Sequence, residues 1–238
     1  MLRRAFTLIE LLVVIAIVAL LLGILVPALG AARARARAAV CSSHLHQMSL
    51  ATTLYLDEHK QVFWPYYTDV TGGRKWWFGF EAGGPGSGTK RPLDKTQAAL
   101  APYISTTSDL FQCPDFPYND PNYFPKFAQR SASLGFNLTL ANQRLDKFSP
   151  SAVFVFADGI HFDANPGFNE GHYIQYTPNT AMKSGYAHFR HQGQAQYALL
   201  DGHVDRQRLS GPAYTTIGGG AAGNLGTPEA PTAVYGLP

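Results

Sequence analysis

The chain has 238 residues, of which 46% are hydrophobic and only 15% are charged. That length suits one ordinary domain with extensions, or two small domains, and the hydrophobic share is enough for a packed core. The net charge of +3 is too small to indicate a nucleic-acid partner. The two cysteines do not form a Cys-x-x-Cys pair, which argues against a structural zinc site.

An apolar segment at residues 6–26 is the first distinctive feature of the chain. As a helix, its 21 residues would be about 30 Å long, which is the thickness of the hydrocarbon core of a membrane. An ordinary signal sequence has an apolar stretch of only about 7–15 residues. We therefore predict a membrane-spanning helix at residues 6–27. Basic side chains that suit lipid head groups follow it at Arg33, Arg35 and Arg37.

Glu10 is a carboxylate inside this apolar segment, where a charge is costly. Two explanations are open from the residue alone. A charge within a membrane span commonly has a function. A glutamate in the first turn of a helix also stabilises the positive end of the helix dipole.

Residues 6–17, Phe-Thr-Leu-Ile-Glu-Leu-Leu-Val-Val-Ile-Ala-Ile, resemble the processing site and helix start of type IV prepilins and type II secretion pseudopilins. The resemblance implies a leader at residues 1–5, which a prepilin peptidase cuts off between Ala5 and Phe6 before methylating the new amine. It also implies that Glu10 pairs with the N-terminal amine of a neighbouring subunit during assembly.

Other features depart from the pattern of this family. Ala5 stands where the family has glycine, and residues 28–30, Ala-Leu-Gly, fit an ordinary signal-peptidase site. The count of lysine and arginine on the two sides of the span favours the opposite orientation to that of the family, whose short leader stays inside. We predict the family orientation, with a single pass through the inner (cytoplasmic) membrane and a C-terminal head outside the cytoplasm, in a filament or at the cell surface.

Helical character continues through residues 28–60, which we predict to be an amphipathic extension of the membrane helix packed against the head. An apolar stripe with a spacing of three or four residues indicates this packing. The stripe consists of Cys41, Leu45, Met48, Thr52 and Tyr55. Outside the cytoplasm, Cys41 can form a disulfide with Cys113, and the alternative is two free buried thiols.

Residues 61–208 contain short apolar runs separated by glycine and proline, which predicts a β-rich head. Asp158 and Asp201 are each followed by glycine and lie between two apolar runs, as in β-hairpins. Residues 209–238 are poor in charged side chains and rich in small ones, and we predict a flexible tail there. The predicted fold class is α+β, with a long N-terminal helix packed on a small antiparallel β-sheet head, as in pilins.

His191, followed after nine residues by Asp201 and Gly202, resembles the H-x9-D-G segment of a large bacterial group with prepilin-type processing. The major pseudopilins, which are related to that group, bind calcium in their heads, so a divalent cation is conceivable here too. The candidate ligands are Asp158, His191, Asp201 and His203. Histidine is a poor calcium ligand, and the alternative is that His191 bonds a backbone group and fixes its hairpin. We expect no other cofactor.

The chain lacks the motifs of a Ser-His-Asp triad, a P-loop, a dinucleotide-binding turn and an H-E-x-x-H zinc site. We therefore expect that the protein is not an enzyme. The main prediction is a pilin- or pseudopilin-like structural subunit whose partners are the prepilin peptidase, other subunits and membrane lipids. One alternative is a membrane-anchored module that binds carbohydrate or peptide through the aromatic cluster at residues 76–80. Another is an exported metal-dependent hydrolase built on His191, Asp201 and His203.

Overall fold

The structure is a computed structural model, in which the chain divides into two compact units, Met1–Arg37 and Ala38–Pro238. Each unit is described by itself. The residues that the structure describes are 7–84, 90–104, 109–162, 167–175, 185–209, 215–217 and 220–223.

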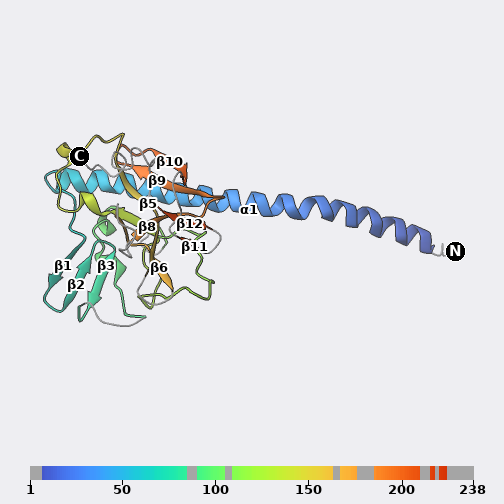
Figure 1. The fold of residues 1–238 in the computed structure, drawn as a ribbon, viewed down its shortest axis with the longest axis horizontal. Helices are drawn as coiled ribbons and strands as arrows, with labels where there is room; N and C mark the ends of the chain where they lie inside the picture. Colours follow the sequence, from blue (N-terminus) through green and yellow to red (C-terminus); the bar gives the residue numbers. More distant parts are fainter. Residues whose placement is uncertain are drawn as a thin grey trace, which may run out of the picture. The chain divides into compact units, whose positions relative to one another are not determined.

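One long helix, α1 (Leu8–Glu58), confirms the N-terminal helix predicted from the sequence (Figure 1). It continues through Pro27, although proline cannot donate the main-chain hydrogen bond that a helix interior requires. Among the described residues, α1 is the helix that is long and apolar enough to cross a membrane. The apolar side chains from Leu8 to Leu29 are exposed within the chain.

In the second unit, α1 buries one face from Cys41 onward. The buried side chains are Cys41, Leu45, Met48, Ser49, Ala51, Thr52 and Leu56. Their spacing of three or four residues confirms the amphipathic stripe, while Tyr55 is only half-buried. The buried face begins at Cys41 and not at residue 28, because arginines at every second position point to different sides of a helix and leave no apolar face.

A small antiparallel sheet follows α1 in the chain. Its strands, paired in sequence order, are β1 (Tyr67–Val70), β2 (Gly73–Trp76) and β3 (Gly79–Ala82). Between β2 and β3 the chain sends Trp77 and Phe78 into the core, where about 1% of each is exposed. Most of the aromatic cluster at residues 76–80 therefore packs the interior.

The described residues also form a nine-stranded sheet, whose main path is β10-β9-β5-β8-β12-β11 with antiparallel neighbours. Beside this path, β4 and β6 pair with β5, and β7 pairs in parallel with β4. The strands are β4 (Leu134–Asn137), β5 (Phe154–Phe162), β6 (Phe168–Glu170), β7 (Tyr173–Ile174), β8 (Gly185–Phe189), β9 (Gln194–Leu199), β10 (Val204–Arg208), β11 (Thr215–Ile217) and β12 (Gly220–Gly223). The described connections contain four 3-10 helices, η1 (Lys95–Gln97), η2 (Ala101–Tyr103), η3 (Leu138–Leu140) and η4 (Leu145–Lys147).

Only one of the two predicted Asp-Gly hairpins is present. Strands β9 and β10 form the hairpin predicted at Asp201, and Gly202 in its turn has a φ of +93°. Asp158 and Gly159 instead lie inside the continuous strand β5, so the prediction of a turn there was wrong. Gly159 allows a close approach of two backbones, because a Cβ at this position would collide with the main-chain oxygen of Gly171.

The predicted flexible tail at residues 209–238 contains two strands, which corrects that prediction for β11 and β12. Strand β12 pairs with β8, and the side chain of Ala222 is fully buried. Strands β11 and β12 are held by main-chain hydrogen bonds, which do not require an alternating pattern of apolar side chains. A segment rich in glycine and alanine therefore gave no sequence signal for these strands.

Among the described residues, the largest of three buried clusters joins the second part of α1 to the head. Leu45 and Met48 of α1 belong to the same buried cluster as the aromatic side chains of the head. Three hydrogen bonds connect α1 to β9. The Ser49 hydroxyl donates to the Leu199 carbonyl at 2.8 Å, the Ser42 hydroxyl donates to Gln196 Oε1 at 3.0 Å, and Gln196 Nε2 donates to the Ala38 carbonyl at 3.1 Å.

Candidate functional site

The start of α1 carries the residues predicted for processing and assembly. Ala5 and Phe6 lie outside the described residues. Thr7 and Glu10 form a capping box, in which the main-chain N–H and the hydroxyl of Thr7 each donate to Glu10 Oε2 at 2.8 Å. The Glu10 N–H donates in return to the Thr7 hydroxyl oxygen at 3.3 Å. Within the single chain Glu10 thus caps the helix, and its pairing with a neighbouring subunit stays a prediction.

Four buried side chains with potential metal-binding atoms meet in the second unit. Cys41 comes from α1, Cys113 from the loop before β4, Asp158 from β5 and His191 from the turn between β8 and β9. The sulfur, oxygen or nitrogen atoms that they offer all lie within 4.8 Å of one another. We call these four residues the Cys-Asp-His cluster.

The contacts inside the Cys-Asp-His cluster are short. Cys41 Sγ lies 3.4 Å from Asp158 Oδ1, and Cys113 Sγ lies 3.3 Å from His191 Nε2. His191 Nε2 is also 3.3 Å from Asp158 Oδ2. The four side chains thus form an unbroken chain of polar contacts, in which the imidazole of His191 joins Cys113 to Asp158 and Asp158 joins His191 to Cys41.

Local geometry explains why His191 reaches this place. The main chains of His191 and Gln194 exchange two hydrogen bonds, of 2.9 and 3.1 Å, around a two-residue turn. Both turn residues have positive φ, 55° at Gln192 and 78° at Gly193, as a type I′ turn requires. The turn connects β8 to β9, which each pair antiparallel with β5, and it leaves His191 beside Asp158 in the middle of β5. On the other side, the Cys113 N–H donates to the Ser133 hydroxyl at 2.8 Å and fixes the loop.

Further polar groups orient the imidazole and the carboxylate of the cluster. Asp115 Oδ2 lies 3.0 Å from His191 Nδ1, so the ring stands between two carboxylates. The main-chain N–H of Gln196 donates to Asp158 Oδ2 at 2.8 Å. Each of these contacts fixes one side of its partner and leaves the other side toward the centre of the cluster.

Arg190 supplies a buried positive charge next to the cluster. Its Nε lies 3.3 Å from Asp158 Oδ1, and only about 1% of the Arg190 side chain is exposed. Arg190 Nη2 donates to the carbonyl oxygens of Ser133 and Gly159, at 3.0 and 2.9 Å. The guanidinium therefore joins β4 and β5 while it compensates the carboxylate of Asp158.

Burial and neighbouring charges act against each other on the pKa values of the cluster. Burial raises the pKa of Asp158, but the charge of Arg190 and the hydrogen bond from His191 lower it to about 2. Burial lowers the pKa of His191, but its hydrogen bonds to Asp158 and Cys113 raise it to about 10. Burial raises the pKa of Cys41, whereas for Cys113 the hydrogen bond from Cys41 and the charge of Arg190 outweigh burial and lower the pKa. The carboxylate of Asp158 thus faces positive charge on two sides, at Arg190 and at His191.

The structure holds Cys41 and Cys113 as free thiols, so the predicted disulfide is not present in it. Both side chains are fully buried, which matches the alternative of two free buried thiols. The sulfur atoms share their surroundings with Asp158 and His191 and form polar contacts with them. The expected proximity of the Cys113 loop to the helix that carries Cys41 is present.

The two ends of the H-x9-D-G motif have different surroundings. The ring of His191 contacts side chains of the cluster and its border, and not the backbone group expected from the sequence. Asp201 and Gly202 form the β9–β10 turn, where Asp201 Oδ1 accepts from the His203 N–H at 3.0 Å. Gly202 O lies 2.9 Å from His46 Nδ1, so this turn contacts α1.

Of the predicted cation ligands, the structure brings Asp158 and His191 together, while Asp201 and His203 lie outside the group. The His203 side chain is 82% exposed, so the three residues of the hydrolase hypothesis do not converge. The two cysteines were not predicted as ligands, because metal-binding cysteines are recognised in a sequence by short spacings such as Cys-x-x-Cys, which this chain lacks. The Cys-Pro-Asp segment at residues 113–115 was the available signal, since it supplies both Cys113 and the carboxylate behind His191.

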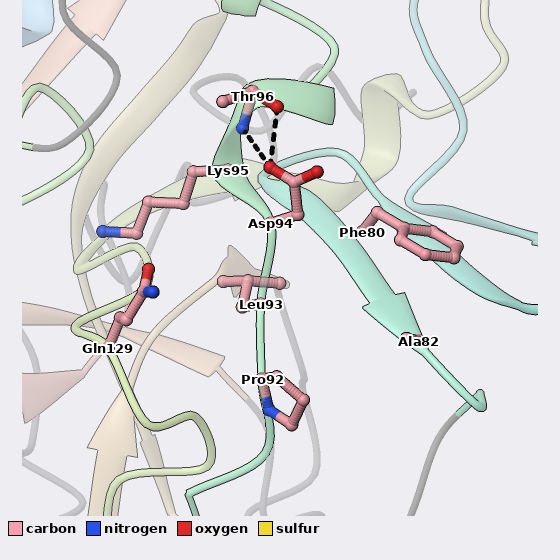
Figure 2. A pocket seen from close by; sticks show the side chains of 8 residues that line it. All are labelled: Phe80, Ala82, Pro92, Leu93, Asp94, Lys95, Thr96 and Gln129. Atoms are coloured by element: carbon pink, nitrogen blue, oxygen red, sulfur yellow. Dashed lines mark hydrogen bonds between the residues drawn. The ribbon is translucent and has the colours of Figure 1, made fainter.

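An open hollow of about 490 Å³ lies between β3 and η1, and Figure 2 shows its lining. Its carboxylate, Asp94, accepts hydrogen bonds from the N–H and the hydroxyl of Thr96, at 3.0 and 2.7 Å, and caps η1. The lining contains no histidine or cysteine among the described residues and is separate from the Cys-Asp-His cluster. The hollow therefore has fewer side chains that could bind a metal or take part in catalysis than the Cys-Asp-His cluster has.

Comparison with known proteins bears on the N-terminus. Residues 1–26 match the family described as the Prokaryotic N-terminal methylation motif. No curated protein and no solved structure matches the chain. The motif, continued by the apolar helix α1, indicates a type IV pilin-like protein that is processed by a prepilin peptidase and anchored in a membrane, with a C-terminal head.

Proposed function

We propose that the chain is a structural, non-enzymatic subunit of a type IV pilus-like filament or of a secretion pseudopilus. In this proposal the head lies outside the cytoplasm, and subunits associate through the first part of α1. One observation carries the proposal: the methylation motif at residues 1–26 contains a run of apolar side chains that are exposed within the chain.

The exposed side chains explain why the first unit requires partners. Leu8 is 79% exposed, Leu20 67% and Ile24 70%. Removing one leucine or isoleucine side chain from water stabilises by about 1.5–3 kcal/mol, so a row of them favours lipid or other helices strongly over water. Membrane lipid meets this requirement before assembly, and the helices of neighbouring subunits meet it in a filament.

Glu10 supplies the specificity in this proposal. Both donors of the capping box bind the same oxygen, Oε2, so the second carboxylate oxygen can accept from another group. In an apolar filament core a carboxylate is costly unless an opposite charge pairs with it. The N-terminal amine of a neighbouring processed subunit has that charge, and capping and pairing can therefore coexist.

Two substitutions separate capping from pairing. Glu10→Gln keeps an oxygen that can accept from Thr7, since glutamine also serves in a capping box, but it removes the charge. Glu10→Ala removes both. We expect both variants to insert in the membrane and to be processed, and both to lose assembly. Assembly is measured as the fraction of protein in sheared filaments and as the oligomers formed by a photocrosslinking residue placed at position 13.

The mass of the N-terminal peptide is the accompanying control, because it shows whether cleavage and methylation took place in each variant. Loss of assembly in Glu10→Ala alone would mean that the cap, and not the charge, matters. Assembly at the wild-type level in both variants would refute the role of Glu10. A wild-type protein that is processed but never crosslinks to a second copy would refute the subunit proposal itself.

A further inference from the structure

We propose that the Cys-Asp-His cluster, formed by Cys41, Cys113, Asp158 and His191, binds one transition-metal ion, zinc by its donor chemistry. The site would tie four distant parts of the head together. It is independent of the proposal on assembly, which concerns the first unit of the chain.

The distances agree with tetrahedral coordination. Zinc bonds of about 2.3 Å to sulfur and about 2.0–2.1 Å to nitrogen or oxygen place neighbouring ligand atoms roughly 3.3–3.8 Å apart. The contacts from Cys41 to Asp158, from Cys113 to His191, and from His191 to Asp158 are 3.4, 3.3 and 3.3 Å. Asp158 forms these contacts through both of its oxygens, and the four ligand atoms lie within 4.8 Å of one another, so a small closure of the group brings them around one ion.

The donor atoms select the metal. Two thiols, one imidazole and one carboxylate offer two sulfurs, one nitrogen and one oxygen. Calcium and magnesium prefer shells of oxygen ligands, whereas mixed sulfur and nitrogen donors suit zinc. This site shares Asp158 and His191 with the divalent-cation site considered from the sequence, and its two cysteines favour zinc over calcium.

The charges around the site also suit a divalent ion. Asp158 and Arg190 already compensate each other across 3.3 Å. A bound divalent ion adds two positive charges, which two deprotonated thiols balance, so no uncompensated charge results in the buried site.

Residues behind the ligands are placed as they are in known metal sites. Asp115 contacts His191 Nδ1 at 3.0 Å, which fixes the ring so that Nε2 faces the centre of the cluster. Asp158 is oriented by the Gln196 N–H and by Arg190. A carboxylate behind a histidine ligand is a frequent outer-shell arrangement, and its loss typically weakens metal binding 10- to 100-fold.

The full burial of the four ligands indicates a structural site instead of a catalytic one. All four protein ligands are present and at most 5% of any of these residues is exposed, so no position is open for water or substrate. The ion would join α1, the loop before β4, strand β5 and the β8–β9 turn. Because the ligands come together only in the folded head, binding would be coupled to folding.

The full chain, purified in detergent without chelators and without oxygen, provides the test. Elemental analysis is expected to find about one zinc per chain in the wild type and in the control variant His203→Ala, whose residue is 82% exposed and outside the cluster. Cys113→Ser and His191→Ala are expected to lose the metal. Tryptophan fluorescence shows whether each variant is still folded.

Asp115→Asn keeps the proposal testable where the ligand variants do not fold. We expect this variant to retain the metal in elemental analysis but to release it to a chelator at 10- to 100-fold lower chelator concentration than the wild type. Cobalt exchanged into the wild type is expected to show the visible absorption of a tetrahedral ion and a thiolate charge-transfer band. A metal-free wild type, a Cys41–Cys113 disulfide detected by mass, or unchanged zinc in a folded Cys113→Ser variant would each overturn the proposal.

Discussion

Replacing Arg190 with methionine tests whether the buried charges of the head are balanced as the structure indicates. Methionine keeps most of the length and apolar volume of the side chain but removes the guanidinium. Asp158, which is fully buried, then loses the guanidinium 3.3 Å from its Oδ1 and keeps only His191 as a positive partner. The carbonyl oxygens of Ser133 and Gly159 also lose a charged donor. The balance fails with or without a metal, because both states of the cluster include the positive charge of Arg190.

The expected cost is about 3–5 kcal/mol of the free energy of unfolding, the range found when one partner of a buried ion pair is removed. Urea unfolding of the full chain in detergent, followed by tryptophan fluorescence, measures this loss. Trp64 and Trp77 are 2% and 1% exposed, so their emission reports on unfolding of the head. The matched control is Arg206→Met, at an exposed position of β10, where we expect a change within about 0.5 kcal/mol.

A second substitution shows whether the cost is electrostatic. In metal-free protein, Asp158→Asn removes the uncompensated charge and keeps the shape, so the double variant Asp158→Asn/Arg190→Met should be more stable than Arg190→Met alone. We expect the two substitutions to be coupled by about 0.5–3 kcal/mol. If Arg190→Met is no less stable than Arg206→Met, or if the double variant only adds the two losses, the account of the charge balance is wrong.

Three further predictions concern the core, the sheet and the pH dependence of the head. Leu45→Ala should lower the free energy of unfolding by about 2–5 kcal/mol, whereas Leu50→Ala, on the exposed side of the same helix, should change it by less than about 0.5 kcal/mol; equal losses would contradict the packing of α1. Gly159→Ala should destabilise by about 1–3 kcal/mol, because its Cβ meets the main chain of Gly171, and unchanged urea unfolding would contradict this. Burial, and after it nearby positive charges, hold the pKa of His172 well below 6.5, so the unfolded chain binds a proton that the folded chain does not, and stability falls as the pH drops below 6.5. Relative to His172→Gln, the wild type should lose about 1 kcal/mol between about pH 6 and about pH 5, and parallel pH profiles would contradict this reasoning.

The helix and one hairpin could be predicted because their signals are local. The apolar run after Phe6 and the stripe that includes Leu45 and Met48 depend on spacings of a few residues within one element. The turn at Asp201 and Gly202 is equally local. The same dipeptide failed at Asp158, because what decides its structure is not local: Asp158 is buried among charged partners, and its glycine allows a second backbone to approach.

The Cys-Asp-His cluster could not be predicted as a unit, since each member comes from a different element. Nothing in the order of Cys41, Cys113, Asp158 and His191 along the chain shows that α1 and β5 lie side by side at this point. The separate hints were correct in part, because Cys113 was placed near Cys41, and both Asp158 and His191 were considered as ligands. What was missing was the sheet order, which places the β8–β9 turn next to the middle of β5.

The arrangement of β9 along α1 explains the spacing within the H-x9-D-G motif. Gln196 contacts Ser42, and three residues later Leu199 contacts Ser49, seven residues further along α1. Three strand residues and seven helix residues both span about 10 Å, so β9 and α1 keep the same register over this distance.

A strand that follows a helix in this way must be fixed at both ends. At one end His191 enters the cluster that contains Cys41, and at the other end the turn at Gly202 contacts His46. The nine residues between the histidine and the aspartate are then the length of a turn, one strand and the start of the next turn. Lengthening the segment by one residue would displace one of the two attachments and turn the side chains beyond the insertion to the opposite face of the sheet. The spacing is therefore better explained by the docking of β9 on α1 than by a catalytic role.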